Sequence, residues 1–491
     1  MLMTTPVAAQ HAVGVFGDHI DIGAVASPGS ASFDEAAGEY IVSSSGTNMW
    51  FDEDQFHFVW RRMSGDVIIN AMANLVGEGT DPHRKAGIML RSNLSDSSRY
   101  VGIAVHGDGL VSMQFRREDG AETEEVQSRI SDAEAIQLSR HGGVFSASAA
   151  RSGEVYTTDH IADIDLGDEV YAGIFVCAHD NTVTETATFR NVRVTIPAAV
   201  DFQPYQDYIG GNLEVLDVET GRREIVMRSP NAIQAPNWTP DGETLIYNEN
   251  GLLYNFDVET RTSSVLDTDF ATRNNNDHVL SFDGTKIAIS HHSADDDGQS
   301  IIYWLPVEGG TPTRVTPLGP SYLHGWSPDA QWLTYTGGRD GVYDIYKIPI
   351  EGGQEVQLTD EPGLDDGPEY SPDGEYIYFN STRSGKMKLW RMRPDGSQPE
   401  QLTFDEMNDW FPHISPDGQT IVFISYEPTV APSDHPWYKQ VYLRKVPVNP
   451  PEGVRPEVIA YVYGGQGTIN VPSWSPDGRY VAFVSNSDPL D

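Results

Sequence analysis

Cysteine is nearly absent from this chain, and long apolar runs are missing altogether. Cys177 is the only cysteine among 491 residues, so no intramolecular disulfide can form and cysteine use does not report the redox compartment. It lies in the apolar stretch YAGIFVCAHD, where a buried small side chain is expected. No stretch approaches the ~20 apolar residues that span a bilayer. We therefore expect a soluble protein.

Basic residues are also scarce. The chain has 32 Lys and Arg against 72 Asp and Glu, and the resulting net charge of -40 is spread along its length. A nucleic-acid partner is disfavoured, because binding phosphates requires clustered positive side chains. Such acidity is typical of a soluble, self-repelling surface, including surfaces adapted to a saline habitat. It also makes divalent cations a ligand class to consider.

Several enzyme signatures are missing as well. The sequence contains no G-x-S-x-G elbow, no P-loop and no H-E-x-x-H motif. Their absence argues against prolyl-oligopeptidase-like activity, and we expect no organic cofactor.

The first residues bear on localisation. Residues 1–12, MLMTTPVAAQHA, carry no basic residue and only a short apolar run. They nevertheless resemble the tail of a signal peptide, with small residues around a cleavage point. On this ground we expect a periplasmic or secreted protein.

What the chain does contain is a repeat of six similar hairpins. Many Gly, Pro, Asp and Thr residues accompany 10% aromatics, which favours an all-β protein of strands and tight turns. The turn aspartates are separated by 42, 46, 44, 44 and 60 residues, and a period in the low forties is typical of propeller blades. The hairpins are NWTPDGETLIY (237–247), VLSFDGTKIAI (279–289), GWSPDAQWLTY (325–335), EYSPDGEYIYF (369–379), HISPDGQTIVF (413–423) and SWSPDGRYVAF (473–483).

The end of the repeat predicts how the ring closes. Five hairpins are followed by a second pair of strands, but the sixth ends near the last residue. GNLEVLDVETGRREIV (211–226) precedes the first hairpin and matches the missing pair. We therefore expect a sixth blade built from both ends of the repeat region, which removes the open edges of the ring.

These hairpins resemble the TolB-type repeat, a relative of the WD propeller repeat. The resemblance covers about 285 residues and implies a six-bladed propeller over residues 209–491. It says little about function, since this fold serves binding proteins and enzymes alike.

The first half of the chain shows no such repeat. Eight segments read as strands of an antiparallel sandwich. Their pattern resembles the concanavalin-like or laminin-G-like jelly rolls, which implies a sugar-binding role or a spacing role for residues 13–197, with 198–208 as a linker. The segments are 55–62, 66–75, 85–92, 99–107, 110–118, 143–153, 168–179 and 183–196.

Polar side chains precede each propeller hairpin and should meet on one face around the central channel. We expect Asp366, Glu369 and Asp409 to supply acid or base groups there. The same pattern favours SPDG aspartates as structural turn residues. Side chains expected to contact a ligand are Asn276, Tyr322, Trp410, His413 and Trp437.

Histidines on this face suggest a metal. His278 and His324 occupy the same register on adjacent blades, and His292 lies on a neighbouring loop. Imidazoles placed side by side could share a divalent ion such as Ca, Mn or Zn. Oligogalacturonate lyases, which have seven blades, hold a metal with histidines in propellers of similar repeats, and the resemblance implies this role without a full match of ligands.

Three functions remain open. The first is an exported carbohydrate- or polymer-binding protein. The second is a metal-assisted polysaccharide or oligosaccharide lyase or hydrolase at the same face. The third is a periplasmic propeller that docks another envelope protein, as in TolB itself.

Overall fold

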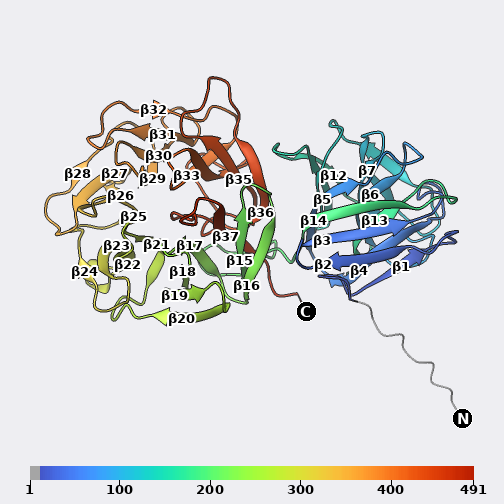
Figure 1. Cartoon of the computed structure of the whole chain (residues 1–491), viewed down its shortest axis with the longest axis horizontal. Coiled ribbons are helices and arrows are strands. Elements are labelled where there is room, and N and C mark those ends of the chain that lie inside the picture. The colour runs from blue at the N-terminus through green and yellow to red at the C-terminus, as the bar shows by residue number, and fades with distance from the viewer. Residues whose placement is uncertain (1–11, 491) are drawn as a thin grey trace, which may run out of the picture. The chain divides into compact units, whose positions relative to one another are not determined.

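The computed structural model describes residues 12–490, so most of the proposed signal remnant lies outside the described residues. The chain divides into two compact units, Met1–Asp201 and Phe202–Asp491 (Figure 1). No helix within the described range is long and apolar enough to cross a membrane.

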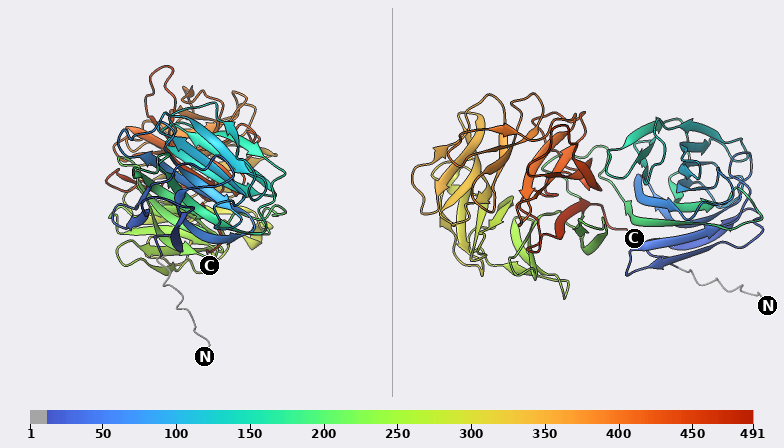
Figure 2. Two further views of the ribbon diagram at one scale, coloured as in Figure 1. Left: turned by 90° about the vertical axis from the view of Figure 1, so that its right-hand side faces the viewer. Right: turned by 45° about the horizontal axis from the view of Figure 1, so that its top comes forward.

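The first unit contains two antiparallel sheets of seven strands each, whose curved strands can be followed in Figure 2. Strands of the two sheets contact each other through buried apolar side chains. One sheet has the order β1 (Asp18–Ile22), β4 (Phe56–Ser64), β13 (Glu169–Cys177), β6 (Lys85–Arg91), β7 (Tyr100–His106), β8 (Val111–Arg116) and β9 (Glu124–Gln127). The other has the order β12 (Thr157–Ile161), β11 (Val144–Ala150), β10 (Ala135–His141), β5 (Val67–Leu75), β14 (Glu185–Thr195), β3 (Glu39–Ser44) and β2 (Ser30–Asp34).

All eight segments expected to be strands in this half contain strands of the two sheets. The short strands β1, β2, β3, β9, β10 and β12 were not anticipated, because their apolar alternation is brief or interrupted. Cys177 is fully buried, as its apolar surroundings predicted.

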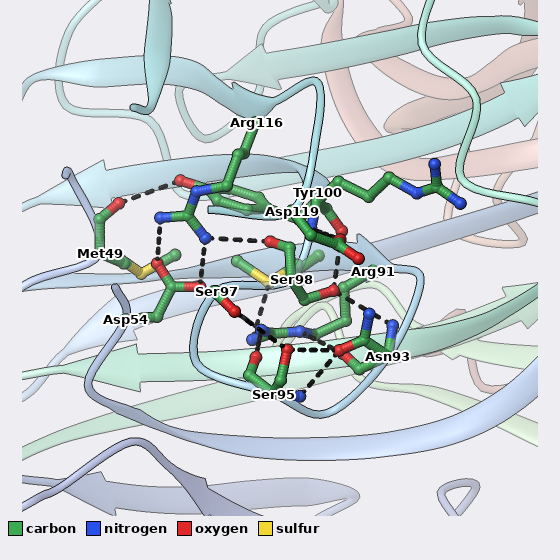
Figure 3. Close-up of polar contacts among 12 residues, drawn as sticks. Met49, Asp54, Arg91, Asn93, Ser95, Ser97, Ser98, Tyr100, Arg116 and Asp119 are labelled. Carbon is green, nitrogen blue, oxygen red and sulfur yellow. Dashed lines mark hydrogen bonds and ion pairs between the residues drawn. The ribbon is translucent and has the colours of Figure 1, made fainter. Parts of the chain in front are cut away.

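A buried ionic network holds one sheet of the first unit to its loops. Arg116 donates two hydrogen bonds to Asp54, at 3.0 and 2.8 Å, and Arg91 lies 3.4 Å from the same carboxylate. All three side chains are fully buried. Figure 3 shows both guanidinium groups directed at Asp54, with Tyr100 beside them donating to the carbonyl of Met49 at 3.0 Å. Two cations therefore share one carboxylate inside this unit.

The second unit is a ring of six blades (Figure 1). The innermost strands β17, β21, β25, β29 and β33 contact one another in order around the ring. Blade one comprises β17 (Ile233–Trp238), β18 (Thr244–Glu249), β19 (Leu252–Asp257) and β20 (Thr262–Leu266); blade two comprises β21 (Asn274–Leu280), β22 (Lys286–His292), β23 (Ser300–Pro306) and β24 (Thr313–Arg314), with the short helix η1 (Ala294–Asp296). Blade three comprises β25 (Ser321–Trp326), β26 (Trp332–Arg339), β27 (Val342–Pro349) and β28 (Val356–Gln357); blade four comprises β29 (Asp365–Tyr370), β30 (Ile377–Ser381), β31 (Lys388–Met392) and β32 (Glu400–Gln401). Blade five comprises β33 (Asn408–Ile414), β34 (Thr420–Tyr426), β35 (Lys439–Pro447) and β36 (Glu457–Gly464).

The sixth blade confirms the predicted closure from two ends. β15 (Gly211–Asp217) pairs with β16 (Arg223–Ser229) on one side and with β37 (Tyr480–Asn486) on the other. Its innermost segment is not a regular strand: it pairs with β37 through the Trp474–Val481 bridge and through backbone hydrogen bonds from Ala482 N to Ser473 O at 2.9 Å and from Val484 N to Thr468 O at 3.0 Å. Arg479 also bonds to Asp217 at 2.8 Å, which fastens the two pieces together.

The SPDG turns are held by their own side chains, as expected. Ser371 donates to Asp373 at 2.6 Å, and the same carboxylate accepts the backbone N–H of Glu375 at 3.0 Å. These bonds lower the pKa of Asp373. The carboxylate is therefore used within the turn.

Candidate functional site

The two ends of the propeller carry different loops. We call the end at which the five inner strands begin the head, and the opposite end, which carries the SPDG turns, the base. Strand pairing places the loop after β34 at the head, together with the chain that leads into β15. The long insertion after Tyr426 and residues 202–210 therefore lie at the same end of the ring.

Every complete inner strand has an irregularity at the same place. The register shifts between Gln234 and Asn237 in β17, and at equivalent points in β21, β25, β29 and β33. A bulge leaves residues out of the ladder and redirects their side chains, often next to functional sites. Aligned on the turn aspartates, His278 and His324 replace the proline found in the other four blades, and the residues two positions earlier are Gln234, Asn276, Tyr322, Asp366, Trp410 and Asn470.

Three titratable side chains at these bulges and one from the long insertion interact, and we call Asp277, His324, Asp366 and His435 the axial cluster. His324 Nε2 lies 3.2 Å from Asp366 Oδ1, across the boundary between blades three and four. Thr336 donates to the same oxygen at 2.6 Å. His435 Nε2 lies 3.9 Å from Asp366 Oδ2. Side chains from blades two, three, four and five thus act on one another.

The axial cluster separates the pKa values of its two carboxyl groups. Burial raises the pKa of Asp277 to about 7, and the charge of His324 offsets part of that rise. Burial alone would also raise the pKa of Asp366, but its hydrogen bond to His324 and the charge of that imidazole lower it to about 2. Two carboxyl groups with such different pKa values are chemically distinct at neutral pH.

The two histidines of the axial cluster respond in opposite ways. Burial works against the charge of His324, yet the hydrogen bond to Asp366 and the charge of Asp277 raise its pKa. Burial lowers the pKa of His435, and the charge of Asp366 only partly opposes this. Asp366 and His324 therefore stabilise each other's charged forms, whereas burial favours the neutral form of His435.

Three buried donors close to the axial cluster have no acceptor within the described part of the chain: Asn276 Nδ2, Trp410 Nε1 and Trp437 Nε1. Asn276 precedes Asp277, and the Trp410 ring lies 4.4 Å from the His435 ring. An unsatisfied buried donor costs about 1–3 kcal/mol. Such groups call for a polar partner such as water or a ligand.

Aromatic rings gather at the head beside the axial cluster. Trp437 meets Tyr205 edge to face at 4.5 Å and Tyr208 at 6.1 Å. Burial raises the pKa of Tyr322, and the charges of Tyr343, Asp277, Asp366 and Tyr205 raise it further. Tyr205 therefore lies near both Trp437 and Tyr322, and it is 76% exposed. We call Tyr205, Tyr208, Tyr322 and Trp437 the aromatic group.

The structure brings several of the expected site residues together. Tyr322, His324 and Asp366 join the axial cluster or lie against it, and Asn276 and Trp410 are adjacent to it. Sequence reasoning did not select Asp277 and His435 as site residues. Asp277 sits within a bulge, where strand alternation gives no direction, and His435 lies on the long insertion that lengthens the last repeat spacing.

Glu369 and His413 form a separate pair. His413 Nδ1 lies 2.7 Å from Glu369 Oε2, and His413 Nε2 lies 2.6 Å from the carbonyl of Ile469. Glu369 also accepts the backbone N–H of Ile414 at 3.1 Å. Both side chains are thus held by neighbouring blades.

Asp409, which we expected to act as an acid or base, lies in a buried ionic network. Its carboxylate accepts a 2.8 Å hydrogen bond from Ser425 and lies within 3.3 Å of Lys388 and Arg444. The side chain has no exposed surface. These contacts fit a structural role.

The three expected metal ligands have different protein partners. His278 Nε2 lies 3.2 Å from the carbonyl of Ile246, and burial lowers the pKa of His278 to about 4. His292 Nδ1 lies 3.1 Å from the carbonyl of Gly298 in its own loop. Within residues 12–490, no group of three or more His, Cys, Asp or Glu is arranged to hold a metal ion. The side chains as placed do not fit a metal centre.

Comparisons with known proteins agree with a propeller of one particular class. A family model described as the TolB beta propeller domain matches residues 324–432. An uncharacterized protein of Agrobacterium fabrum is 46% identical over 274 residues, which are 56% of this chain and 91% of that protein. The chain belongs to the TolB-type β-propeller family.

Solved structures include similar folds. A putative TolB from Agrobacterium tumefaciens is 44% identical to this chain and has a TM-score of 0.54. The match covers 58% of this chain and 100% of that one. TolB from Acinetobacter baumannii is 20% identical, with a TM-score of 0.40, and covers 52% of this chain and 64% of its own. The second likeness is too low to support an argument about function.

Proposed function

We propose that this protein binds a carbohydrate or another hydroxyl-rich polymer at the head of the propeller. The observation that carries the proposal is the set of three unpaired buried donors, Asn276 Nδ2, Trp410 Nε1 and Trp437 Nε1, beside the axial cluster. Sugar hydroxyl groups both accept and donate hydrogen bonds, so they can satisfy these donors and also bond to carboxylates.

The aromatic group supports the same ligand class. Aromatic side chains offer broad apolar faces at low conformational cost, and the C–H faces of sugar rings can stack on them. Tyr205 supplies an exposed ring next to Trp437 and Tyr322. Apolar faces next to a few convergent polar groups are typical of small-molecule sites.

A glycan array probed with the full chain tests this proposal. Binding to one or more saccharides, weakened at least tenfold in Trp437→Ala, would support it. Phe282→Ala is the matched control, because Phe282 is a partly exposed aromatic residue in a hairpin turn at the base. If no saccharide binds the full chain, or if both variants lose binding equally, the proposal fails.

The split carboxyl pair favours a second candidate, hydrolysis or elimination at the head. Asp277, with a pKa of about 7, could donate a proton near neutral pH, while Asp366 stays ionised. An assay for new reducing or unsaturated ends, run with the saccharides that bind, tests this candidate. Unchanged ends after prolonged incubation would exclude catalysis on those saccharides. Whether the purified protein carries a divalent metal is tested separately by an elemental spectrum.

We place the protein in the periplasm or outside the cell, in keeping with the signal-like residues at its start, and assign the first unit to the concanavalin-like jelly rolls. Fractionation of the native host tests the location.

The remaining alternative, docking of another envelope protein as in TolB, predicts a specific partner in pull-downs from envelope extracts and no saccharide on the array.

A further inference from the structure

Polar side chains form a row across one sheet of the first unit, on the face turned away from the other sheet. They follow one another across four neighbouring strands, as Lys85 of β6, His106 of β7, Gln114 of β8 and Glu125 of β9. We call these four residues the polar row. The apolar cluster on the same face includes Met49 from a loop and no residue of the other sheet. The polar row therefore lies outside the core of the sandwich.

Lys85 is a buried amine with a single hydrogen bond. It is 2% exposed, and its Nζ donates to Asn48 Oδ1 at 3.2 Å. Among the described residues, it forms no salt bridge. Burial lowers the pKa of Lys85. Whether the amine is protonated or neutral, it keeps at least one N–H that no acceptor of the described chain takes up.

Gln114 is a buried amide whose oxygen has no donor. Its Nε2 lies 3.2, 3.3 and 3.4 Å from Ser112 Oγ, Glu125 Oε1 and His106 Nε2. Burial lowers the pKa of His106 to about 4, and Nδ1 of this ring lies 3.0 Å from the carbonyl of Leu110. The neutral ring thus carries its proton on Nδ1 and accepts at Nε2. These acceptors fix the orientation of the amide, and Gln114 Oε1 remains buried without a partner in the described part of the chain.

The two unsatisfied groups complement each other. Lys85 offers a donor and Gln114 an acceptor, and buried groups of this kind call for a polar partner. A hydroxyl group both donates and accepts, and a sugar ring carries several on neighbouring carbons. On the same face of β7, Gly102 lies opposite Gln114 and Ala104 follows two residues later. Neither has a bulky side chain, so the face is low between the two polar groups.

Both ends of the polar row reach the surface. Asn48 at one end and Glu125 at the other are half-buried. Aromatic side chains lie near the second end, because the carbonyl of Trp50 accepts the backbone N–H of Thr123 at 3.0 Å, two residues before Glu125. Trp50 is half-buried, and the next residue, Phe51, is 61% exposed. Aromatic side chains beside a few polar groups are typical of small-molecule sites.

The charge at the outer strand favours a neutral ligand. Burial works against the charge of Glu125, but hydrogen bonds from Gln127, Ser112 and Gln114 lower its pKa. A sugar that carried a carboxylate would bring a second negative charge to this partly buried group, which is unfavourable.

We infer that the polar row is a second saccharide-binding site, which takes a neutral sugar. One hydroxyl of the sugar donates to Gln114 Oε1, and another accepts from Lys85 Nζ. The site is separate from the one proposed at the head of the propeller and does not depend on it. It gives the first unit a binding role of its own in place of a spacing role.

Calorimetry of the full chain with neutral tetrasaccharides tests the inference. The probes are cellotetraose, xylotetraose, mannotetraose and maltotetraose. At least one should bind Trp437→Ala with one equivalent per chain, because that variant alters only the head. In this background, Gln114→Leu and Lys85→Met should each weaken the remaining binding about tenfold or more. Gln137→Leu is the matched control, since Gln137 is a buried amide on β10 of the other sheet.

Melting curves check that each variant is folded. If neither variant of the polar row folds, amide exchange on Trp437→Ala decides the question. The bound sugar should then slow exchange in residues 47–51, beside the polar row, and in no loop of the propeller.

Tetrasaccharide binding that disappears entirely in Trp437→Ala would overturn the inference and leave the head site intact. Equal losses in Gln114→Leu and Gln137→Leu, or remaining binding limited to uronate tetramers, would also overturn it. Binding that is unaffected by Trp437→Ala and lost in Gln114→Leu would support the polar row while the proposal for the head fails. If the full chain binds no saccharide, both proposals fall.

Discussion

His324 and Asp366 lie on inner strands of neighbouring blades, with Nε2 of the imidazole 3.2 Å from Oδ1 of the carboxylate. His324 stands where four other blades have proline, and Asp366 occupies a position where other blades carry Gln, Asn, Tyr or Trp. The pair therefore exists only where these two blades meet. It organises the charges of the axial cluster.

Asp366→Asn should destabilise the propeller most at mildly acidic pH. Because the pKa of His324 is raised in the folded protein, its protonation stabilises the fold. This stabilisation is complete below the ordinary histidine pKa of about 6.5 and is lost as pH rises through the raised pKa. The pKa of Asp366 is lowered to about 2, so its ionisation stabilises the fold fully above pH 3.8, and this stabilisation is lost as pH falls toward 2. We expect a cost of roughly 2–3 kcal/mol at pH 5.5 and a smaller one at pH 8.5.

Denaturant unfolding at the two pH values measures this difference. Asp295→Asn, at an exposed carboxylate of the short helix η1 in the propeller, is the control for loss of a carboxylate. An equal cost for Asp366→Asn at both pH values would contradict the ion pair.

Asp277→Asn should also change the pH dependence of stability, through the raised pKa of its carboxyl group. The folded protein keeps a proton on Asp277 up to its pKa of about 7, whereas the unfolded chain loses it near 3.8. Stability therefore falls as pH rises between these values, by up to about 1.4 kcal/mol per pH unit. The variant lacks this slope, so it should gain stability relative to the parent between pH 4.5 and 7.5. Parallel unfolding midpoints of parent and variant over that range would show that Asp277 titrates normally.

Gly367→Ala tests the bulge of β29. Gly367 has φ of +63°, and an added Cβ would lie 2.6 Å from Asn380 Oδ1 and 3.0 Å from the ring of Phe411. Gly418→Ala is the matched control, with φ of +69° and open space around the added atom. Both variants bear the left-handed backbone strain, but only the first forces neighbours apart. We expect Gly367→Ala to lower the free energy of unfolding by about 1–3 kcal/mol more than the control does, which a lower melting temperature would show. Equal melting temperatures for the two variants would contradict this packing.

The buried network of the first unit gives a prediction independent of the propeller. Asp54→Ala leaves the guanidinium groups of Arg91 and Arg116 buried without their carboxylate. Removing one partner of a buried ion pair costs about 3–5 kcal/mol. The melting transition of the first unit should fall while that of the propeller stays in place, whereas Glu53→Ala, an exposed neighbour, should move neither. Proteolysis that spares both units equally in Asp54→Ala would count against the network.

The repeat allowed the ring and its closure to be predicted, because the turn chemistry of Ser, Pro, Asp and Gly is local. The pairing of 211–226 with the last hairpin followed from counting strands, and β15 and β37 confirm it. Side-chain partners could not be predicted in the same way. Asp409 looked like a free carboxylate in sequence, yet Lys388 and Arg444 reach it from other strands of blades four and five.

The directions of side chains at the bulges could not be predicted from the sequence either. Alternation assigns faces only where the ladder is regular, and each complete inner strand loses its register just before its hairpin. Tyr322, His324 and Asp366 were selected because they lie on segments that enter the inner strands, on one face of the ring. Asp277 lies on the same face, but it was assigned no role beside Asn276 and His278. The position of His435 depended on the fold of a long insertion, which has no repeat to guide it.

The sixth blade also sets an order of events during synthesis. Asn212 of β15 bonds to Ser485, 273 residues further along the chain. A ribosome making this protein must release nearly the whole propeller before β15 can meet β37, so five blades wait with an unpaired edge. Final assembly of the ring is therefore a late step that follows synthesis of the other five blades, and the interval before it is when chaperones would matter most.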